Sequence, residues 1–277
     1  MNPAPLFDGQ RVVLSAHDER IAILRLSNPP EGFMDEHSER ELALALDAID
    51  ASPALRVVIV TGGQEGVFVR HYDVRELEQR ARAMHARGLR FSTDRPVPEA
   101  GIHRCIGRME ASARIFVAGI NGAAMGGGYE VALGCDLRIA QDGDYRIGLP
   151  ETNIGLLPGA GGTQRLAQLV GAARALEWML LGRTFTPREA AAAGLVSECC
   201  EAPVLARCLA LAEDLAARHP LALAHVKRLV RRGSTAVSQA GLADERTLFC
   251  DLMVSQRTID EMTAFNAGGR SIAERGR

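Results

Sequence analysis

Two patterns of apolar residues alternate along the first half of the chain. Residues 11–15 and 21–26 are rich in aliphatic side chains and are separated by the polar stretch 17–20, which predicts an antiparallel hairpin. Shorter apolar runs predict further strands at 57–60, 115–120, 137–140 and 145–147. Some of these runs are apolar throughout, which is typical of strands buried in a parallel sheet. Helical patterns lie between them, and this alternation predicts an α/β core.

A helical period of apolar residues follows Asp35, a good N-cap residue. Leu42, Leu46 and Ile49 share one face of a helix that is predicted to end near Ser52-Pro53. Residues 73–113 are polar, arginine-rich and helical in propensity, with a break at two prolines. From residue 187 onward strand signals nearly vanish, and amphipathic helices are expected at 205–216, 221–232 and 242–253. The stretch 262–277 thins out into glycine and charge, and no element is predicted there.

These patterns divide the 277 residues into an α/β core, residues 1–199, and a helical C-terminal region, residues 200–277. The apolar fraction of 47% and the charged fraction of 24% are typical of an ordinary globular protein. The formal net charge of −2 gives no global attraction to nucleic acid. We find no apolar run long enough for a membrane span and no signal peptide, so no membrane association is expected.

Six cysteines are scattered along the chain without a CxxC pair or a zinc-type Cys/His spacing. In a chain of this length such thiols are typical of small buried apolar residues in a reducing compartment. We therefore expect a cytoplasmic protein with no metal site and no disulfide framework.

A glycine triplet lies between a predicted strand and a predicted helix. Gly126, Gly127 and Gly128 precede Tyr129-Glu130, and they fit neither the phosphate-binding loop nor the dinucleotide-binding pattern. Glycine lets a ligand approach the backbone, and N–H groups at a helix start can stabilise a developing oxyanion. Taken alone, the triplet could equally serve close packing of a helix on a sheet.

Two glutamates border this glycine segment and a second glycine-rich one. Glu130 lies in the first turn after the triplet, and Glu151 follows Pro150 in a loop. Carboxylates in such positions can move protons in carbonyl chemistry. Favourable interaction with a helix dipole would also explain Glu130, and Glu151 could be a solvated loop charge.

The motifs around these residues resemble the crotonase, or enoyl-CoA hydratase/isomerase, superfamily. The pattern NGxAxGGGxE after a strand, the string PGAGGTQRL at 158–166 and the segments GRTF and AAAAGLVS carry the likeness. The resemblance implies a spiral of ββα units with a C-terminal helical region that trimerises, as a homotrimer or a dimer of trimers. It also implies an acyl-CoA thioester as substrate, with no cofactor beyond the coenzyme A of the substrate and no metal.

The same resemblance implies roles for individual residues. The backbone N–H of Gly127 falls on one donor of the family's oxyanion hole, and by residue order that of Tyr72 falls on the second. Arg70, His71 and Tyr72 depart from the family's small residues there, so the pocket should be reshaped. Substrate contacts are expected from His71, Asp73, Gly126, Gly128 and Gly159.

Enoyl-CoA hydratases of the family carry both glutamates, one as the base for water and one as the proton donor to Cα. The presence of Glu130 and Glu151 therefore favours hydration, the reversible syn addition of water to a trans-2-enoyl-CoA. An isomerase or another enolate-forming acyl-CoA enzyme is the first alternative. A non-catalytic protein of the same fold, in which the altered oxyanion segment no longer works, is the second. RNA binding belongs with it because residues 227–232 hold four cations, although such a cluster without aromatic residues is more typical of a solvated helix face.

Overall fold

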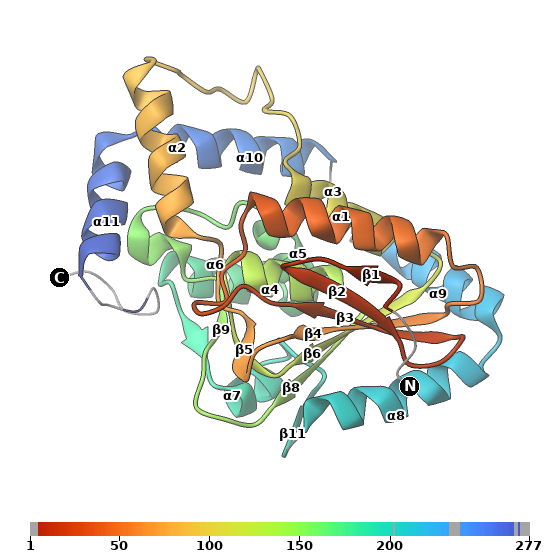
Figure 1. The fold of residues 1–277 in the computed structure, drawn as a ribbon. Coiled ribbons are helices and arrows are strands. Elements are labelled where there is room, and N and C mark those ends of the chain that lie inside the picture. The colour runs from red at the N-terminus through yellow and green to blue at the C-terminus, as the bar shows by residue number, and fades with distance from the viewer. Residues whose placement is uncertain (1–4, 202, 233–238, 269–270, 272–277) are drawn as a thin grey trace.

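The computed structural model of the protein describes residues 5–201, 203–232, 239–268 and 271. Figure 1 shows a mixed sheet with helices on both faces and a group of helices, α2, α10 and α11, standing at one end. The strands are β1 Phe7–Asp8, β2 Val12–Ala16, β3 Ile21–Leu26, β4 Val57–Gly62, β5 Gly66–Val69, β6 Ile115–Ile120, β7 Gly122–Met125, β8 Leu137–Gln141, β9 Ile147–Gly148, β10 Thr184–Phe185 and β11 Glu198–Cys200. The helices are α1 Glu36–Asp50, α2 Val74–Ala86, α3 Gly101–Ala111, α4 Gly127–Gly134, the short 3₁₀ helix η1 Glu151–Ile154, α5 Gly162–Val170, α6 Ala172–Leu180, α7 Pro187–Ala192, α8 Val204–Ala217, α9 Pro220–Arg232, α10 Gln239–Met253 and α11 Gln256–Ala267.

The larger sheet has the strand order β1-β2-β3-β4-β6-β8-β11. The predicted hairpin is confirmed, because β2 and β3 pair antiparallel, and β3, β4, β6, β8 and β11 run parallel. The strand β11 falls in the part of the chain where strand signals were expected to vanish. It is short and is held by its parallel pairing with β8, a tertiary contact that local pattern does not reveal.

The smaller sheet has the order β10-β9-β7-β5 and carries the glycine segment. Its strands are two to four residues long, so sequence periodicity could not identify them. Only β9 was expected, and it begins at Ile147 rather than at residue 145. The parallel pairing of β7 with β5 and β9 brings the ends of these strands together beside α4.

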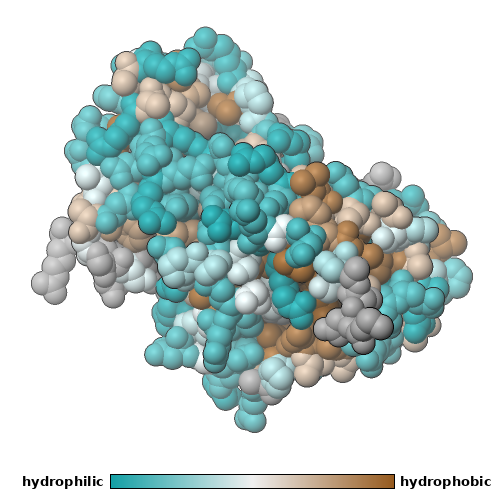
Figure 2. Space-filling view, viewed as in Figure 1, coloured by the Kyte–Doolittle hydropathy of each residue, from teal (hydrophilic) through white to brown (hydrophobic). Residues whose placement is uncertain are grey.

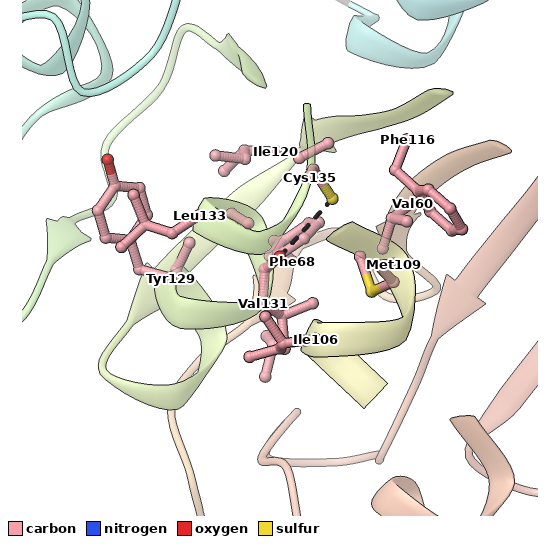
Figure 3. Packing of buried hydrophobic residues seen from close by; sticks show 14 of the residues in the cluster. Val60, Phe68, Ile106, Met109, Phe116, Ile120, Tyr129, Val131, Leu133 and Cys135 are labelled. Atoms are coloured by element: carbon pink, nitrogen blue, oxygen red, sulfur yellow. Dashed lines mark hydrogen bonds between the residues drawn. The ribbon is translucent and has the colours of Figure 1, made fainter. Parts of the chain in front are cut away.

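Helix α1 forms as predicted, with Asp35 as its N-cap accepting a hydrogen bond from the backbone N–H of Ser38 at 2.7 Å. The predicted stripe of Leu42, Leu46 and Ile49 is buried in the main core, on one face of the larger sheet. Figure 3 shows side chains of α3 and α4 in the same core, where Ile106 and Met109 lie near Val131 and Cys135. Helix α4, which carries the glycine segment, is thus fixed by packing along its whole length.

Helix α8 covers the opposite face of the larger sheet. Its buried residues, Val204, Cys208, Ala212 and Ala216, pack on alternate residues of the strands, such as Val57 and Val117. In α10, Leu242 and Met253 are buried within the chain as well. These buried residues of α8 and α10 therefore cover this chain's own core, whereas Leu248 of α10 is exposed.

Exposed apolar side chains lie elsewhere in the helical part of the chain. They are Leu176, Leu180 and Leu181 on and beside α6, and Leu221, Val226, Leu229 and Val230 on α9, with Leu248 on α10. Figure 2 shows a mostly hydrophilic surface over α2 and apolar residues toward the side that carries α8 and α9. In the part of the chain that the structure describes, no helix is both long and apolar enough to cross a membrane.

The helical C-terminal region continues into the stretch after residue 262, for which no element was predicted. Helix α11 begins after its N-cap Ser255, and Ile259 and Met262 are buried against α2 and η1. These two residues are one helical turn apart, and α2 and η1 are distant in sequence, so the local composition gave no sign of the contact. The strands do end near residue 200, while α8 packs on the sheet; the division at 199/200 remains a prediction.

Candidate active site

The glycine segment forms a tight link from strand to helix. Gly126 caps α4 with φ +50° and ψ −129°, a backbone conformation that favours glycine, and its carbonyl accepts from the N–H of Glu130 at 2.9 Å. Gly127 is the first residue of α4, so its N–H has no partner within the helix. Gly128 packs on β5, since an added Cβ would lie 1.9 Å from the carbonyl oxygen of Val69. Close packing is thus the role that the geometry gives to Gly128.

The segment 70–73 passes in front of this helix start. A Cβ built on Gly127 would lie 3.6 Å from the backbone nitrogen of Tyr72, so the two residues predicted to form an oxyanion hole are neighbours. The carbonyl of His71 accepts from the N–H of Met34, and the N–H of Asp73 donates to Met34 in turn. Neither Gly127 N–H nor Tyr72 N–H donates to an acceptor among the described residues. The backbones of the two residues therefore lie close together, and a shared oxyanion hole remains a prediction.

His71 lies inside this segment and is buried. Its Nδ1 is 2.7 Å from the carbonyl oxygen of Tyr72, so Nδ1 carries the proton and donates it. The ring stacks on Phe33 at 4.5 Å between centroids, and Phe265 of α11 contacts it edge-on at 6.0 Å. Burial lowers the pKa of His71 to about 4, so the imidazole is neutral at pH 7. It orients the backbone around Tyr72.

Asp73 is the N-cap of α2. Its carboxylate accepts from the N–H of Arg75 at 2.9 Å and pairs with the Arg75 guanidinium at 3.0 Å. The structure therefore accounts for Asp73 by helix capping, and its predicted contact with substrate remains a prediction.

Glu130 is almost completely buried, at 2% exposure, in the first turn of α4. Its Oε1 accepts hydrogen bonds from the backbone N–H groups of Ala160 at 2.7 Å and Gly162 at 2.8 Å. A Cβ on Gly162 would lie 2.9 Å from the same oxygen, so the glycine-rich loop closes directly on the carboxylate. Two N–H donors on one oxygen hold the group in a single orientation.

Glu151 begins η1 and is also buried. Its Oε1 lies 3.1 Å from the position of a Cβ built on Gly126, and the Cβ of His71 lies 3.8 Å from that position. The structure thus brings Glu151, Gly126 and the segment around Tyr72 to one point. The Glu130 carboxylate lies on α4 and contacts the glycine-rich loop that contains Gly159.

Behind the loop lies a chain of ion pairs that the motifs did not reveal. Arg165 donates to the carbonyl of Ala160 at 2.8 Å and pairs bidentately with Glu110, both contacts at 2.8 Å. Arg231 joins Glu110 to Asp136, with distances of 2.8 and 2.9 Å. Arg165 is buried, and it therefore braces the loop whose N–H groups hold Glu130.

The basic cluster of α9 takes part in this arrangement. Lys227 is buried, pairs with Asp136 at 2.8 Å and donates to the carbonyls of Met109 and Arg114. Arg231 is used as described above, whereas Arg228 is exposed. Two of the four cations in this cluster are thus committed to contacts inside the chain.

Helices α10 and α11 cover the site. A Cβ on Gly159 would lie 2.8 Å from the Phe249 ring of α10, so this glycine is packed beneath an aromatic side chain. On the other side the backbone of Gly159 lies beside His103 of α3. Neither Phe249 nor His103 belongs to a sequence motif. Their contacts with the glycine-rich loop arise from the packing of α10 and α3, so they could not be predicted from the sequence.

The sequence matches the enoyl-CoA hydratase/isomerase family over residues 16–269. It is 32% identical over 255 residues to 2,3-dehydroadipyl-CoA hydratase of Escherichia coli strain K12, covering 91% of this chain and 94% of that protein. The crystal structure of an enoyl-CoA hydratase from Bacillus anthracis superposes with a TM-score of 0.71 at 27% identity, covering 96% and 100% of the two chains. An enoyl-CoA hydratase structure from Bacillus halodurans, at 21% identity, shares the fold with a TM-score of 0.77 over 92% and 100%.

Proposed function

The chain belongs to the enoyl-CoA hydratase/isomerase family, and we propose that it is an enoyl-CoA hydratase, which adds water reversibly to a trans-2-enoyl-CoA. One observation carries the proposal. Two buried glutamates lie by the neighbouring residues Gly127 and Tyr72: Glu130 follows Gly127 in the first turn of α4, and Glu151 lies beside Gly126. Hydration of an enoyl thioester needs these parts: an oxyanion site and two carboxylates for proton transfer.

In this proposal the thioester oxygen lies between the N–H groups of Gly127 and Tyr72. Withdrawal of electrons toward that oxygen makes Cβ electrophilic, and the two N–H groups stabilise the enolate that forms. Gly127 contributes the positive end of the α4 dipole, which favours negative charge at that position. The neutral His71 keeps the opposite wall free of a competing cation.

Glu130 is the base that takes a proton from the attacking water. The N–H groups of Ala160 and Gly162 hold its carboxylate in one orientation, as a base that must meet a bound water requires. Glu151, beside Gly126, delivers a proton to Cα and completes the syn addition. Both carboxylates are buried, so bulk water is kept away from the reacting carbon atoms.

The test is turnover of a trans-2-enoyl-CoA series, followed by loss of the ultraviolet absorbance of the conjugated thioester. Wild-type protein should hydrate at least one chain length, and Glu130→Gln and Glu151→Gln should each lose about 10²- to 10⁴-fold in kcat. Formation of a 2-enoyl-CoA from a 3-enoyl-CoA, without hydration, would instead identify an isomerase. Binding of RNA together with inactivity on every acyl-CoA would support the non-catalytic alternative.

We also propose a homotrimer or a dimer of trimers. The exposed apolar side chains of α6 and α9 supply a surface for a second copy, with Leu229 and Val230 each about two-thirds exposed. We also propose a cytoplasmic location, because scattered free thiols are typical of a reducing compartment and all six cysteines are free in the structure. Light scattering would test the assembly, and a monomeric mass across micromolar concentrations would remove it.

A further inference from the structure

We propose that the acyl end of this site binds a carboxylate carried by the substrate, through Arg246 of α10 and His103 of α3. The inference rests on the proposed function for the position of the thioester. It names the substrate class as enoyl-CoA thioesters of dicarboxylic acids, which carry a terminal carboxylate where ordinary fatty acyl groups carry a methyl.

The first observation is a pair of buried polar groups with unmet hydrogen-bonding capacity. Arg246 is 9% exposed, and its Nη1 has no hydrogen-bond partner among the described residues. Both ring nitrogens of His103 are buried; the ring faces the backbone of Gly159, and neither nitrogen has a well-aligned hydrogen bond in that part of the chain. Buried polar groups are normally satisfied, so a ligand or water is expected beside these side chains.

The second observation is the sign of the local charge. The charged groups that act most strongly on the His103 ring are all cations: Arg246, Arg165 and Arg104. Burial, reinforced by these cations, lowers the pKa of His103 to about 4 against the opposing contact with the Gly159 backbone, so the ring is neutral at pH 7 and adds no second cation. The acid near Arg246 is Glu99, whose side chain is 41% exposed and 3.7 Å from Nη1, beyond hydrogen-bond distance. Such a partly exposed pair is weak.

The third observation is the position of the pair along the path of the acyl group. The Cδ1 of Ile102 lies 3.8 Å from a Cβ built on Gly127, so the start of α3 borders the proposed oxyanion hole. The next residue, His103, lies beside the backbone of Gly159. An acyl chain that leaves the hole and passes the Glu130 loop therefore meets His103.

Arg246 lies on α10, the helix that packs on the same loop. It lies one helical turn before Phe249, so the two residues share a face of α10, and Phe249 packs on Gly159. The Nε of Arg246 donates to the carbonyl of Val97, just before α3, at 3.1 Å. Figure 1 shows α10 running above the start of α3. The guanidinium is thereby held in place, with Nη1 left for a carboxylate.

The experiment measures binding of saturated acyl-CoAs, which do not react. Butyryl-, pentanoyl- and hexanoyl-CoA are compared by calorimetry with succinyl-, glutaryl- and adipoyl-CoA, which have the same carbon counts and a carboxylate at the end. Wild-type protein should bind the carboxylated member about 10- to 100-fold more tightly at its best length, the effect of one hydrogen bond to a charged group.

Variants assign the preference to residues. Arg246→Gln should remove the preference, so that the two series bind alike at each length, and His103→Phe should reduce it. Arg228→Gln, which removes an exposed cation of α9, should keep it; unfolding midpoints show that each variant is folded. Equal or tighter binding of the methyl-terminated series at every length, or a preference that survives Arg246→Gln, overturns the inference alone. Failure to bind any acyl-CoA overturns the proposed function with it.

Discussion

The two sides of the site differ in how they are held. On one side Glu130 is fixed by backbone N–H groups, and an ion-pair chain through Arg165 braces the loop that supplies them. On the other side the segment around Tyr72 is held by a histidine, two aromatic rings and the cover of α11. The first side follows the family motifs and carries the proposed base for water. The second carries the departures from them; in our account it supplies the Tyr72 N–H to the oxyanion site and sets which acyl groups fit.

The largest effect that separates the two sides is expected from the backbone of Tyr72. Tyr72→Pro removes the second N–H donor and should lower kcat about 10²- to 10³-fold. Tyr72→Phe keeps the N–H and removes the hydroxyl that hydrogen-bonds the buried Glu39, so kcat should change only a few-fold. Steady-state kinetics on both variants measures the difference. A folded Tyr72→Pro protein with normal turnover would show that this N–H is not part of the oxyanion site.

A smaller effect is expected from the ion pairs behind Glu130. Arg165→Lys keeps the charge but loses the bidentate contact with Glu110, and the loop should shift. We expect kcat to fall roughly 10- to 100-fold with KM changed less, because small displacements of a catalytic group are costly. Arg207→Lys breaks a comparable pair with Glu198 at the surface and serves as the control. Equal kcat for both variants would mean that Arg165 does not position the loop.

On the Tyr72 side, burial of His71 should make the folding stability of the protein depend on pH below neutrality. The pKa of His71 is about 4 in the folded chain and 6.5 without burial, so between these values the unfolded state binds more protons. Stability is therefore complete above about pH 6.5 and decreases as the pH falls toward 4, with a loss of about 2 kcal/mol at pH 5. Urea unfolding at pH 7 and pH 5 should show that His71→Asn loses about that much less than wild type. His225→Asn, at an exposed site, should behave as wild type; a similar response of all three would contradict the assignment.

Much of the larger sheet and its helices could be predicted because their apolar residues repeat with a regular period. The hairpin, α1 and the strands β4 and β6 lie where the pattern placed them. The short strands of the smaller sheet and β11 have too few residues for a period, and α11 gains its stability from contacts with α2. Tertiary pairing, rather than local preference, decides these elements.

The candidate site shows the same division. Gly127, Glu130 and Glu151 could be singled out because motifs surround them, and the structure places each beside the glycine segments. The N–H groups of Ala160 and Gly162, the brace at Arg165 and the pair His103 and Arg246 could not. They come together only when α3, α5, α9 and α10 pack around the loop, and this packing cannot be predicted from residue spacing.

The central claim is the division of labour between Glu130 and Glu151, and one paired measurement tests it most directly. Product formation from a trans-2-enoyl-CoA is followed beside deuterium uptake at Cα of a saturated acyl-CoA in D₂O, for wild type, Glu130→Gln and Glu151→Gln. The account predicts that Glu130→Gln loses hydration by at least about 10²-fold while Cα exchange persists, and that Glu151→Gln loses both. Hydration by Glu130→Gln at the wild-type rate would contradict it.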